Sequence, residues 1–156
     1  MSASIPAVSR RAALALLLAG PLAACASNGR RSPETTGPAE INRLISQYSR
    51  EYDVPESLIH HVVQVESGYN PAARNGPYYG LMQIVPQTAA TMGHRGPASE
   101  LLDARTNLKY GVKYLRGAYL VAHGNPKRAY DWYRRGYYYE AKRQGLLEET
   151  GLPYTV

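Results

Sequence analysis

The sequence predicts a small all-α domain, α+β at most, preceded by an export segment. Apolar residues recur at helical spacing through most of the region from residue 39 to residue 156. Prolines and glycines interrupt this pattern at places where helices begin and end. Only one short apolar run, residues 80–85, lacks helical spacing and could be extended. A single folded unit of this length can bury a modest core.

The first expected helix follows Pro38, because Ile41, Leu44, Ile45, Tyr48 and Tyr52 form one apolar stripe. The second covers residues 54–68, with Pro55 in its first turn and Gly68 as its stop. We expect further helices over 86–93, from 103 or 106 to about 123, from 126 to the break at Gly136 and over 137–144. Asp103 and Asn125 are the expected N-caps of the helices that follow them. Loops are expected at 69–79 and 94–99.

The first 24 residues are typical of an export signal. Arg10 and Arg11 precede a short apolar run at 12–19, and small residues follow at 22–25. A membrane-spanning helix needs about 20 apolar residues, which this run does not reach. We therefore expect a signal peptide at 1–24, a polar, turn-rich tether at 25–38 and one catalytic domain at 39–156.

Leu22-Ala23-Ala24-Cys25 resembles the lipobox of bacterial lipoproteins, whose cysteine is lipidated and becomes the mature N-terminus. This resemblance implies a membrane anchor on Cys25, and Ala26 favours sorting to the outer membrane, on its periplasmic side. An ordinary signal peptide with an incidental cysteine is the alternative. Ser9-Arg10-Arg11 leaves both the general secretory and the twin-arginine export routes open.

Composition narrows the partners. With 18 basic and 12 acidic residues the chain has a net charge of +6, which favours anionic polymers. Export argues against nucleic acid and for the polymers of the bacterial envelope. The four histidines are scattered without zinc-site spacing, and no phosphate loop or nucleotide motif occurs, so we expect no metal and no cofactor.

Glu66 is the strongest candidate for a catalytic group. Residues three, four and seven positions before it are Val63, Val62 and Ile59, which places its carboxyl on the apolar face of the expected helix. It also lies in the last turn, where the helix dipole disfavours a negative charge. Both effects favour a carboxyl that keeps its proton, as a general acid must.

Three segments around Glu66 resemble one enzyme family in order and spacing. They are Glu66-Ser67-Gly68-Tyr69-Asn70-Pro71, Gly80-Leu81-Met82-Gln83-Ile84-Val85-Pro86-Gln87-Thr88-Ala89, and Leu101-Leu102-Asp103 followed by Asn107-Leu108, Gly111 and Tyr114-Leu115. Together they resemble the lysozyme-like lytic transglycosylases of bacterial cell walls, over about residues 41–136. The resemblance implies a fold like that of goose-type lysozyme.

The resemblance also implies cleavage of the β-1,4 bond between MurNAc and GlcNAc in peptidoglycan. In this family one glutamic acid protonates the glycosidic oxygen and then, as carboxylate, deprotonates the 6-hydroxyl of MurNAc, which closes 1,6-anhydro-MurNAc. Two-carboxylate glycosidases need a second acid. Among the 12 acidic residues no partner of Glu66 is obvious, which favours the one-carboxylate mechanism.

The family match assigns the expected substrate-binding residues. Gln83 has an amide that can bind an N-acetyl or hydroxyl group, and Met82 corresponds to a wall on the sugar side. Ser67 could bond to the substrate or the acid, or equally to its own helix backbone. Gly80 permits a close backbone approach or supplies turn geometry. Tyr133 matches the tyrosine of a further family motif, at residues 132–136.

This further motif, at residues 132–136, also contains a departure from the family. The family has Ala-Tyr-Asn-x-Gly, whereas this chain has Trp132-Tyr133-Arg134-Arg135-Gly136. Arg134 could bind a carboxylate of a peptide stem, or it could point to solvent without replacing the asparagine's role. Two alternatives to a lytic transglycosylase therefore stay open: a hydrolytic muramidase, and a catalytically weak lipoprotein that binds peptidoglycan.

Overall fold

The computed structural model describes residues 37–153. The expected signal peptide, the tether up to residue 36 and Cys25 lie outside the described residues. The described region is mostly helical with one small hairpin, which confirms the predicted fold class. Its elements are α1 (Pro38–Tyr52), α2 (Glu56–Ser67), β1 (Arg74–Asn75), β2 (Tyr78–Tyr79), α3 (Pro86–Thr91), the 3-10 helix η1 (Ala98–Leu102), α4 (Ala104–Val121), α5 (Pro126–Arg135), α6 (Tyr138–Gln144) and α7 (Leu147–Thr150).

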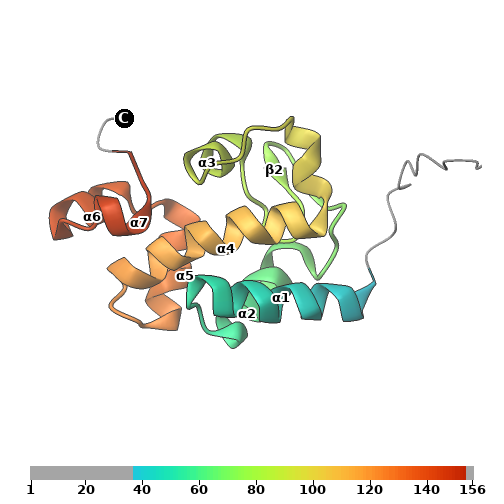
Figure 1. Ribbon diagram of the computed structural model, residues 1–156, viewed down its shortest axis with the longest axis horizontal. Coiled ribbons are helices and arrows are strands. Elements are labelled where there is room, and N and C mark those ends of the chain that lie inside the picture. The colour runs from blue at the N-terminus through green and yellow to red at the C-terminus, as the bar shows by residue number, and fades with distance from the viewer. Residues whose placement is uncertain (1–36, 154–156) are drawn as a thin grey trace, which may run out of the picture. The chain divides into compact units, whose positions relative to one another are not determined.

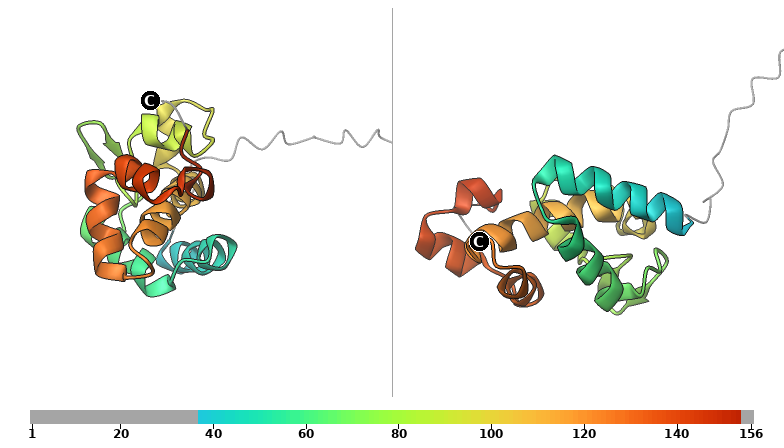
Figure 2. Two further views of the ribbon diagram at one scale, coloured as in Figure 1. Left: turned by 90° about the vertical axis from the view of Figure 1, so that its left-hand side faces the viewer. Right: turned by 90° about the horizontal axis from the view of Figure 1, so that it is seen from below.

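Helix α4 is the centre of this unit. It contacts α1, α3, α5, η1, α6 and α7, and Figures 1 and 2 show these elements packed around it. Its predicted apolar face is confirmed, because Leu108, Val112 and Leu115 have no exposed surface. The stripe of α1 is likewise buried at Ile41, Leu44, Ile45 and Tyr48. Burial of these stripes against α4 stabilises helices that would be marginal alone.

Side chains cap the two helices that the sequence predicts to be capped. Asp103 Oδ1 accepts a hydrogen bond from Thr106 N at 2.8 Å before α4. Asn125 Oδ1 accepts one from Arg128 N at 3.0 Å before α5. Helix α2 ends as predicted at Gly68, which has a φ of 57° in the left-handed region. Helix α2 begins at Glu56 with Pro55 as its N-cap residue, so Pro55 lies just before the first turn, in which it was expected.

The sequence pattern misjudged four short segments. The hairpin of β1 and β2 lies within 69–79, where only a loop was predicted. Residues 80–83 form a turn rather than a strand, and only Ile84 makes an isolated bridge, to Tyr79. A 3-10 helix occupies 98–102. A loop was predicted for 94–99, and no helix was predicted before residue 103. The last helix of the described region, α7, has too few residues to give a helical period.

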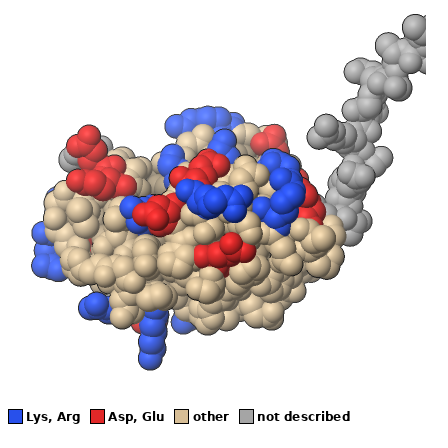
Figure 3. All heavy atoms as spheres, turned by 60° about the horizontal axis from the view of Figure 1, so that its bottom comes forward, with Lys and Arg blue, Asp and Glu red and all other residues tan. Residues whose placement is uncertain are grey.

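Opposite charges lie close together on the face shown in Figure 3, while a broad neighbouring area has no charged side chain. Glu40 pairs with Arg43 at 2.6 Å and with Arg105 at 3.4 Å, so α1 and α4 are joined at the surface. Exposed pairs of this kind contribute little to stability. Between residues 37 and 153, no helix is both long and apolar enough to cross a bilayer.

Candidate active site

The Glu66 carboxyl lies in the last turn of α2, between the core and the surface. Ile59, Val62 and Val63, on the same side of the helix, have no exposed surface, as predicted. Glu66 itself is half-buried rather than enclosed by apolar groups. Its Oε1 accepts a hydrogen bond from the Tyr130 hydroxyl at 2.9 Å. The carboxyl is therefore positioned by one polar partner and remains accessible.

Tyr130 was not identified from the sequence. It comes from α5 and joins that helix to α2 across 64 residues of sequence. Burial, the hydrogen bond to Glu66 and the charge of Glu66 raise the pKa of Tyr130 to about 12. The phenol thus stays protonated at physiological pH and donates to the carboxyl. Helical spacing could have identified it. Tyr130 lies three residues before Tyr133 and four before Arg134, so these side chains share one side of the expected helix.

Arg134 and His61 flank Tyr130. The Arg134 guanidinium carbon is 5.7 Å from the centroid of the Tyr130 ring, which is within cation–π range. The His61 ring meets the same ring edge to face, with 5.0 Å between centroids. Arg134 is exposed, so its cation is available to solvent next to the Glu66–Tyr130 pair. The family's asparagine position is therefore occupied by a positive charge at the site.

Ser67 is bonded to backbone rather than to the acid. Its hydroxyl lies 3.1 Å from Val63 O within α2 and 2.8 Å from Leu81 O. The second contact ties the end of α2 to the turn at 80–83. Of the two roles considered from the sequence, the structure has the backbone-bonded one.

The turn at 80–83 is organised by Asn107 of α4. The Asn107 amide has no exposed surface; its Oδ1 accepts from Met82 N at 2.8 Å, and its Nδ2 donates to Tyr79 O and Leu101 O at 2.7 Å each. Gly80 is forced by this arrangement. Its φ is 69°, and an added Cβ would lie 2.3 Å from Asn107 Nδ2. Its close approach in this structure is to protein.

Three more predicted substrate-binding residues also serve the turn. Met82 has no exposed surface and packs against Gly111, where an added Cβ would lie 2.5 Å from its sulfur. Gln83 has a φ of 46°, and its Nε2 donates to Gly80 O at 2.9 Å and Ala73 O at 3.3 Å. Tyr133 is buried and donates to Met82 O at 2.7 Å. Its pKa is raised well above the usual value, first by burial.

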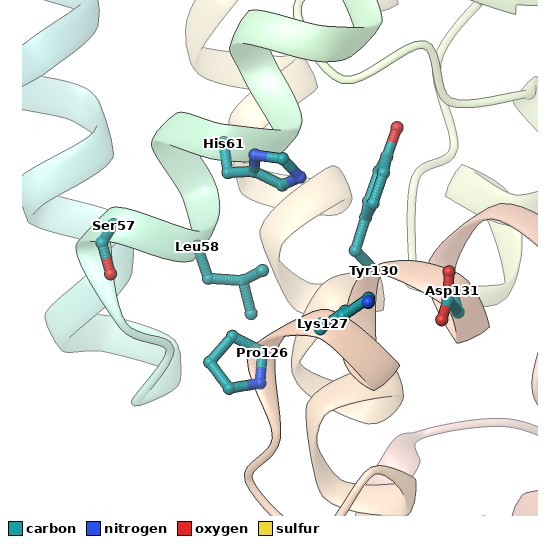
Figure 4. Close-up of a pocket in the computed structure, with 7 residues that line it drawn as sticks. All are labelled: Ser57, Leu58, His61, Pro126, Lys127, Tyr130 and Asp131. Carbon is teal, nitrogen blue, oxygen red and sulfur yellow. The ribbon is translucent and has the colours of Figure 1, made fainter.

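An open groove lies between the first turns of α2 and α5 (Figure 4). Leu58 and Pro126 form its apolar floor, and Tyr130 is one of its walls. His61, Lys127 and Asp131 add groups that can be charged. Glu66 is not among the residues that line this groove; Tyr130, which lines it, donates its hydroxyl hydrogen bond to Glu66. In the part of the chain that the structure describes, no cluster of three metal-ligating side chains occurs.

The family of the chain follows from comparison with known proteins. A family model described as "Transglycosylase SLT domain" matches residues 43–145, which is most of the described region. The chain belongs to this family, and the resemblance predicted from the three segments is confirmed. A lysozyme-like all-α fold agrees with the helices observed.

A relative extends this assignment. "Membrane-bound lytic murein transglycosylase C" from Mannheimia succiniciproducens is 39% identical over a 94-residue alignment, which covers 53% of this chain and 26% of the relative. The chain thus spans about a quarter of that relative's length. No solved structure gives a significant match.

Proposed function

We propose that this chain is a peptidoglycan lytic transglycosylase that cleaves the β-1,4 bond between MurNAc and GlcNAc and forms 1,6-anhydro-MurNAc. The family assignment and the name of the relative support the reaction class. The observation that supports Glu66 as its acid is the geometry of the carboxyl. It is half-buried and bonded through one oxygen to Tyr130, which lines an open groove.

In this proposal the two carboxyl oxygens of Glu66 have different tasks. Oε1 accepts from Tyr130, so the carboxyl is fixed in orientation and Oε2 is left for the proton. Glu66 donates this proton to the glycosidic oxygen as the bond to C1 breaks. The resulting carboxylate then takes the proton of the MurNAc 6-hydroxyl, whose oxygen bonds to C1. One residue acts first as acid and then as base, and no water enters the product.

Two kinds of residue assist in this proposal. Ser67, Gly80, Met82, Gln83 and Tyr133 act by fixing the 80–83 turn. Within this turn Gln83 is partly exposed and can meet the glycan. Arg134 acts directly, because its exposed guanidinium beside Tyr130 can pair with a carboxylate of the peptide stem. Peptidoglycan is thus the substrate, with no cofactor, metal or nucleic acid in the reaction.

We also propose that the enzyme works in the periplasm, tethered to the outer membrane through lipid on Cys25. The lipobox-like segment before Cys25 supports the anchor. The name of the relative includes "membrane-bound". Lipid labelling of the full chain tests this idea: Cys25→Ser should abolish label and membrane association together. Membrane association that persists in Cys25→Ser would overturn it.

Mass analysis of peptidoglycan digests tests the reaction. Anhydro-muropeptides are expected as the product of the full chain. Reducing ends would support a hydrolytic muramidase instead, and binding without any product would support a catalytically weak peptidoglycan-binding lipoprotein.

The hydrolytic alternative has one specific residue to examine. Asp131 lines the groove that Tyr130 borders, so it is the acidic residue to test as a second catalytic carboxylate. Its side chain is exposed and it contributes to the electrostatics of Tyr130. In our proposal Asp131→Asn leaves the anhydro product unchanged. A switch or loss of product in Asp131→Asn, with the fold intact, would favour a two-carboxylate mechanism.

A further inference from the structure

A second pocket, of about 410 Å³, lies where α5 ends and α6 begins. Aromatic and charged side chains share its lining, which includes Trp132, Arg135, Tyr139, Glu140 and Arg143. None of these residues lines the groove beside Tyr130. We call this set the α5–α6 pocket.

The α5–α6 pocket is on the other side of α5 from the candidate active site. Successive residues of a helix are about 100° apart, so Trp132 lies roughly 200° around α5 from Tyr130. Arg135 is about 140° from Tyr130 on the same count. A ligand in this pocket would therefore not occupy the space beside Glu66.

The aromatic side chains of this pocket present open apolar surface. Tyr139 is 81% exposed, the largest value among the exposed large apolar residues of the described region. It meets Tyr138 edge to face, with 5.3 Å between ring centroids, so its orientation is supported. A tyrosine offers a flat ring with a hydroxyl at its edge, a combination that suits the C–H and O–H groups of a sugar.

Basic side chains outnumber acidic ones in the segment that contains this pocket, although Lys127 and Arg134 of the segment lie on the side of Tyr130. Residues 126–145 contain six basic and two acidic side chains, whereas the rest of 37–153 contains eight basic and nine acidic ones. Glu140 accepts hydrogen bonds from Arg143 and Gln144, and these lower its pKa to about 2. Arg143 is therefore already neutralised by Glu140.

Arg135 differs from Arg143. Its guanidinium carbon is 4.2 Å from the centroid of the Trp132 ring, and within residues 37–153 it forms no ion pair. Stacking on Trp132 fixes the plane of the guanidinium and leaves its edge N–H groups for an external acceptor. A carboxylate is an acceptor that matches two such N–H groups.

We propose that the α5–α6 pocket is a second binding site for a carboxylate-bearing polysaccharide, with a sugar ring on Tyr139 and a carboxylate on Arg135. This rests on the proposed function, under which the ligand is a stretch of peptidoglycan strand away from the bond that is cleaved. The site retains the enzyme on the polymer between cleavage events. An anionic membrane surface is a less suitable partner, because the pocket is concave and only one of its large apolar side chains protrudes.

Binding by the inactive full chain tests this site separately from catalysis. In a Glu66→Gln background, Tyr139→Ala should weaken co-sedimentation with purified sacculi about tenfold, and should also weaken binding to uncharged chito-oligosaccharide. Arg135→Gln should weaken sacculus binding and reduce its salt dependence, with no effect on chito-oligosaccharide. Lys142→Gln, which removes an exposed cation of α6 that does not line the pocket, is the matched control and should change neither.

Catalysis provides the second measurement. With Glu66 present, Tyr139→Ala and Arg135→Gln should keep their turnover of short soluble glycan fragments, while digestion of sacculi slows. Unchanged sacculus binding in both variants would overturn the proposal. It would equally be overturned if both variants lost only their binding to vesicles of anionic phospholipid. Failure of the proposed function would show differently, as absence of anhydro product from the chain with Glu66 intact.

Discussion

The turn at 80–83 and helix α5 both lie next to the last turn of α2, but they use their polar groups in opposite ways. The turn directs its hydrogen-bonding groups inward, to Asn107, Ser67 and Tyr133. Helix α5 directs Tyr130 at Glu66 and exposes Arg134 beside it. Apart from Glu66 itself, the predicted site residues that match the family thus build a support, and the group that touches the acid comes from Tyr130, outside the matched motifs.

This difference teaches where stability and activity should separate. A buried polar group that loses its partner costs more than an exposed one that loses the same bond. Changes at the turn should therefore lower the free energy of unfolding, whereas changes on the exposed side of α5 should alter turnover or affinity with little effect on folding. Four predictions test this separation.

The largest effect is expected from alkaline pH. Burial raises the pKa of Tyr114 to about 12 and those of Tyr133 and Tyr137 well above the usual value, so the folded state keeps protons that the unfolded chain loses near pH 10. The free energy of unfolding therefore has its full value below pH 10, where both states are protonated. It falls as the pH rises toward 12, because only the unfolded chain can ionise these phenols. We expect the free energy of unfolding to fall by about 3 kcal/mol or more across that range.

Urea unfolding monitored by circular dichroism at pH 8, 10, 11 and 12 measures this loss. Tyr139→Phe is the control, because Tyr139 is exposed and should leave the pH dependence unchanged. A free energy of unfolding that stayed flat to pH 12 would show that these phenols are not enclosed as described.

Asn107→Ala should give the next largest effect. It removes three hydrogen bonds, to Met82 N, Tyr79 O and Leu101 O. Met82 N is then buried without an acceptor, whereas Tyr79 O keeps its bond from Ile84 N. We expect a loss of about 3 kcal/mol in the free energy of unfolding. Asn70→Ala removes one exposed bond, to Ala72 N, and should cost less than about 1 kcal/mol. Equal costs in chemical denaturation would contradict the structural role of Asn107.

Two tyrosine-to-phenylalanine changes within α5 compare a hydrogen bond that supports the turn with one that reaches Glu66. Tyr133→Phe leaves Met82 O without its donor and should cost about 1–2 kcal/mol of stability. Tyr130→Phe removes the donor to Glu66; we expect about a tenfold loss in kcat with a stability change below about 1 kcal/mol. Thermal unfolding and turnover of soluble glycan are measured on both variants. A stability loss in Tyr130→Phe together with a kcat loss in Tyr133→Phe would refute the separation.

The smallest effect is expected at Arg134. Arg134→Asn restores the residue type of the family and removes a cation from beside Tyr130. We expect KM for stem-bearing glycan to rise about two- to fivefold, with less change at high salt. Lys142→Asn is a control that removes an exposed cation from another helix, α6. If KM rose equally in both variants, net charge rather than a contact at Arg134 would account for the effect.

Much of the framework could be predicted from the sequence. Apolar periodicity located α1, α2, α4 and α5, and the caps at Asp103 and Asn125 fixed two of their starts. The turn at 80–83 could not be predicted in this way. Its conformation depends on Asn107, which lies 25 residues beyond Met82 and acts through a buried amide. Local pattern contains no information about such a contact.

The candidate site was predictable only in part. The helix position and neighbours of Glu66 follow from spacing within one helix, and they are as expected. Its partner Tyr130 is on another helix, and only the packing of α5 against α2 brings the two together. Arg134 could be identified as a departure from the family, but its contact with the Tyr130 ring required the structure.

The most direct test of the central claim is the product formed by Glu66→Gln from peptidoglycan. Glutamine keeps the shape of the side chain and can still accept from Tyr130, but it cannot give or take the proton. We expect no detectable anhydro-muropeptide by mass analysis, with an unfolding midpoint and sacculus binding close to those of the unaltered chain. Full formation of anhydro-muropeptide by Glu66→Gln would contradict the assignment of Glu66 as the acid and base.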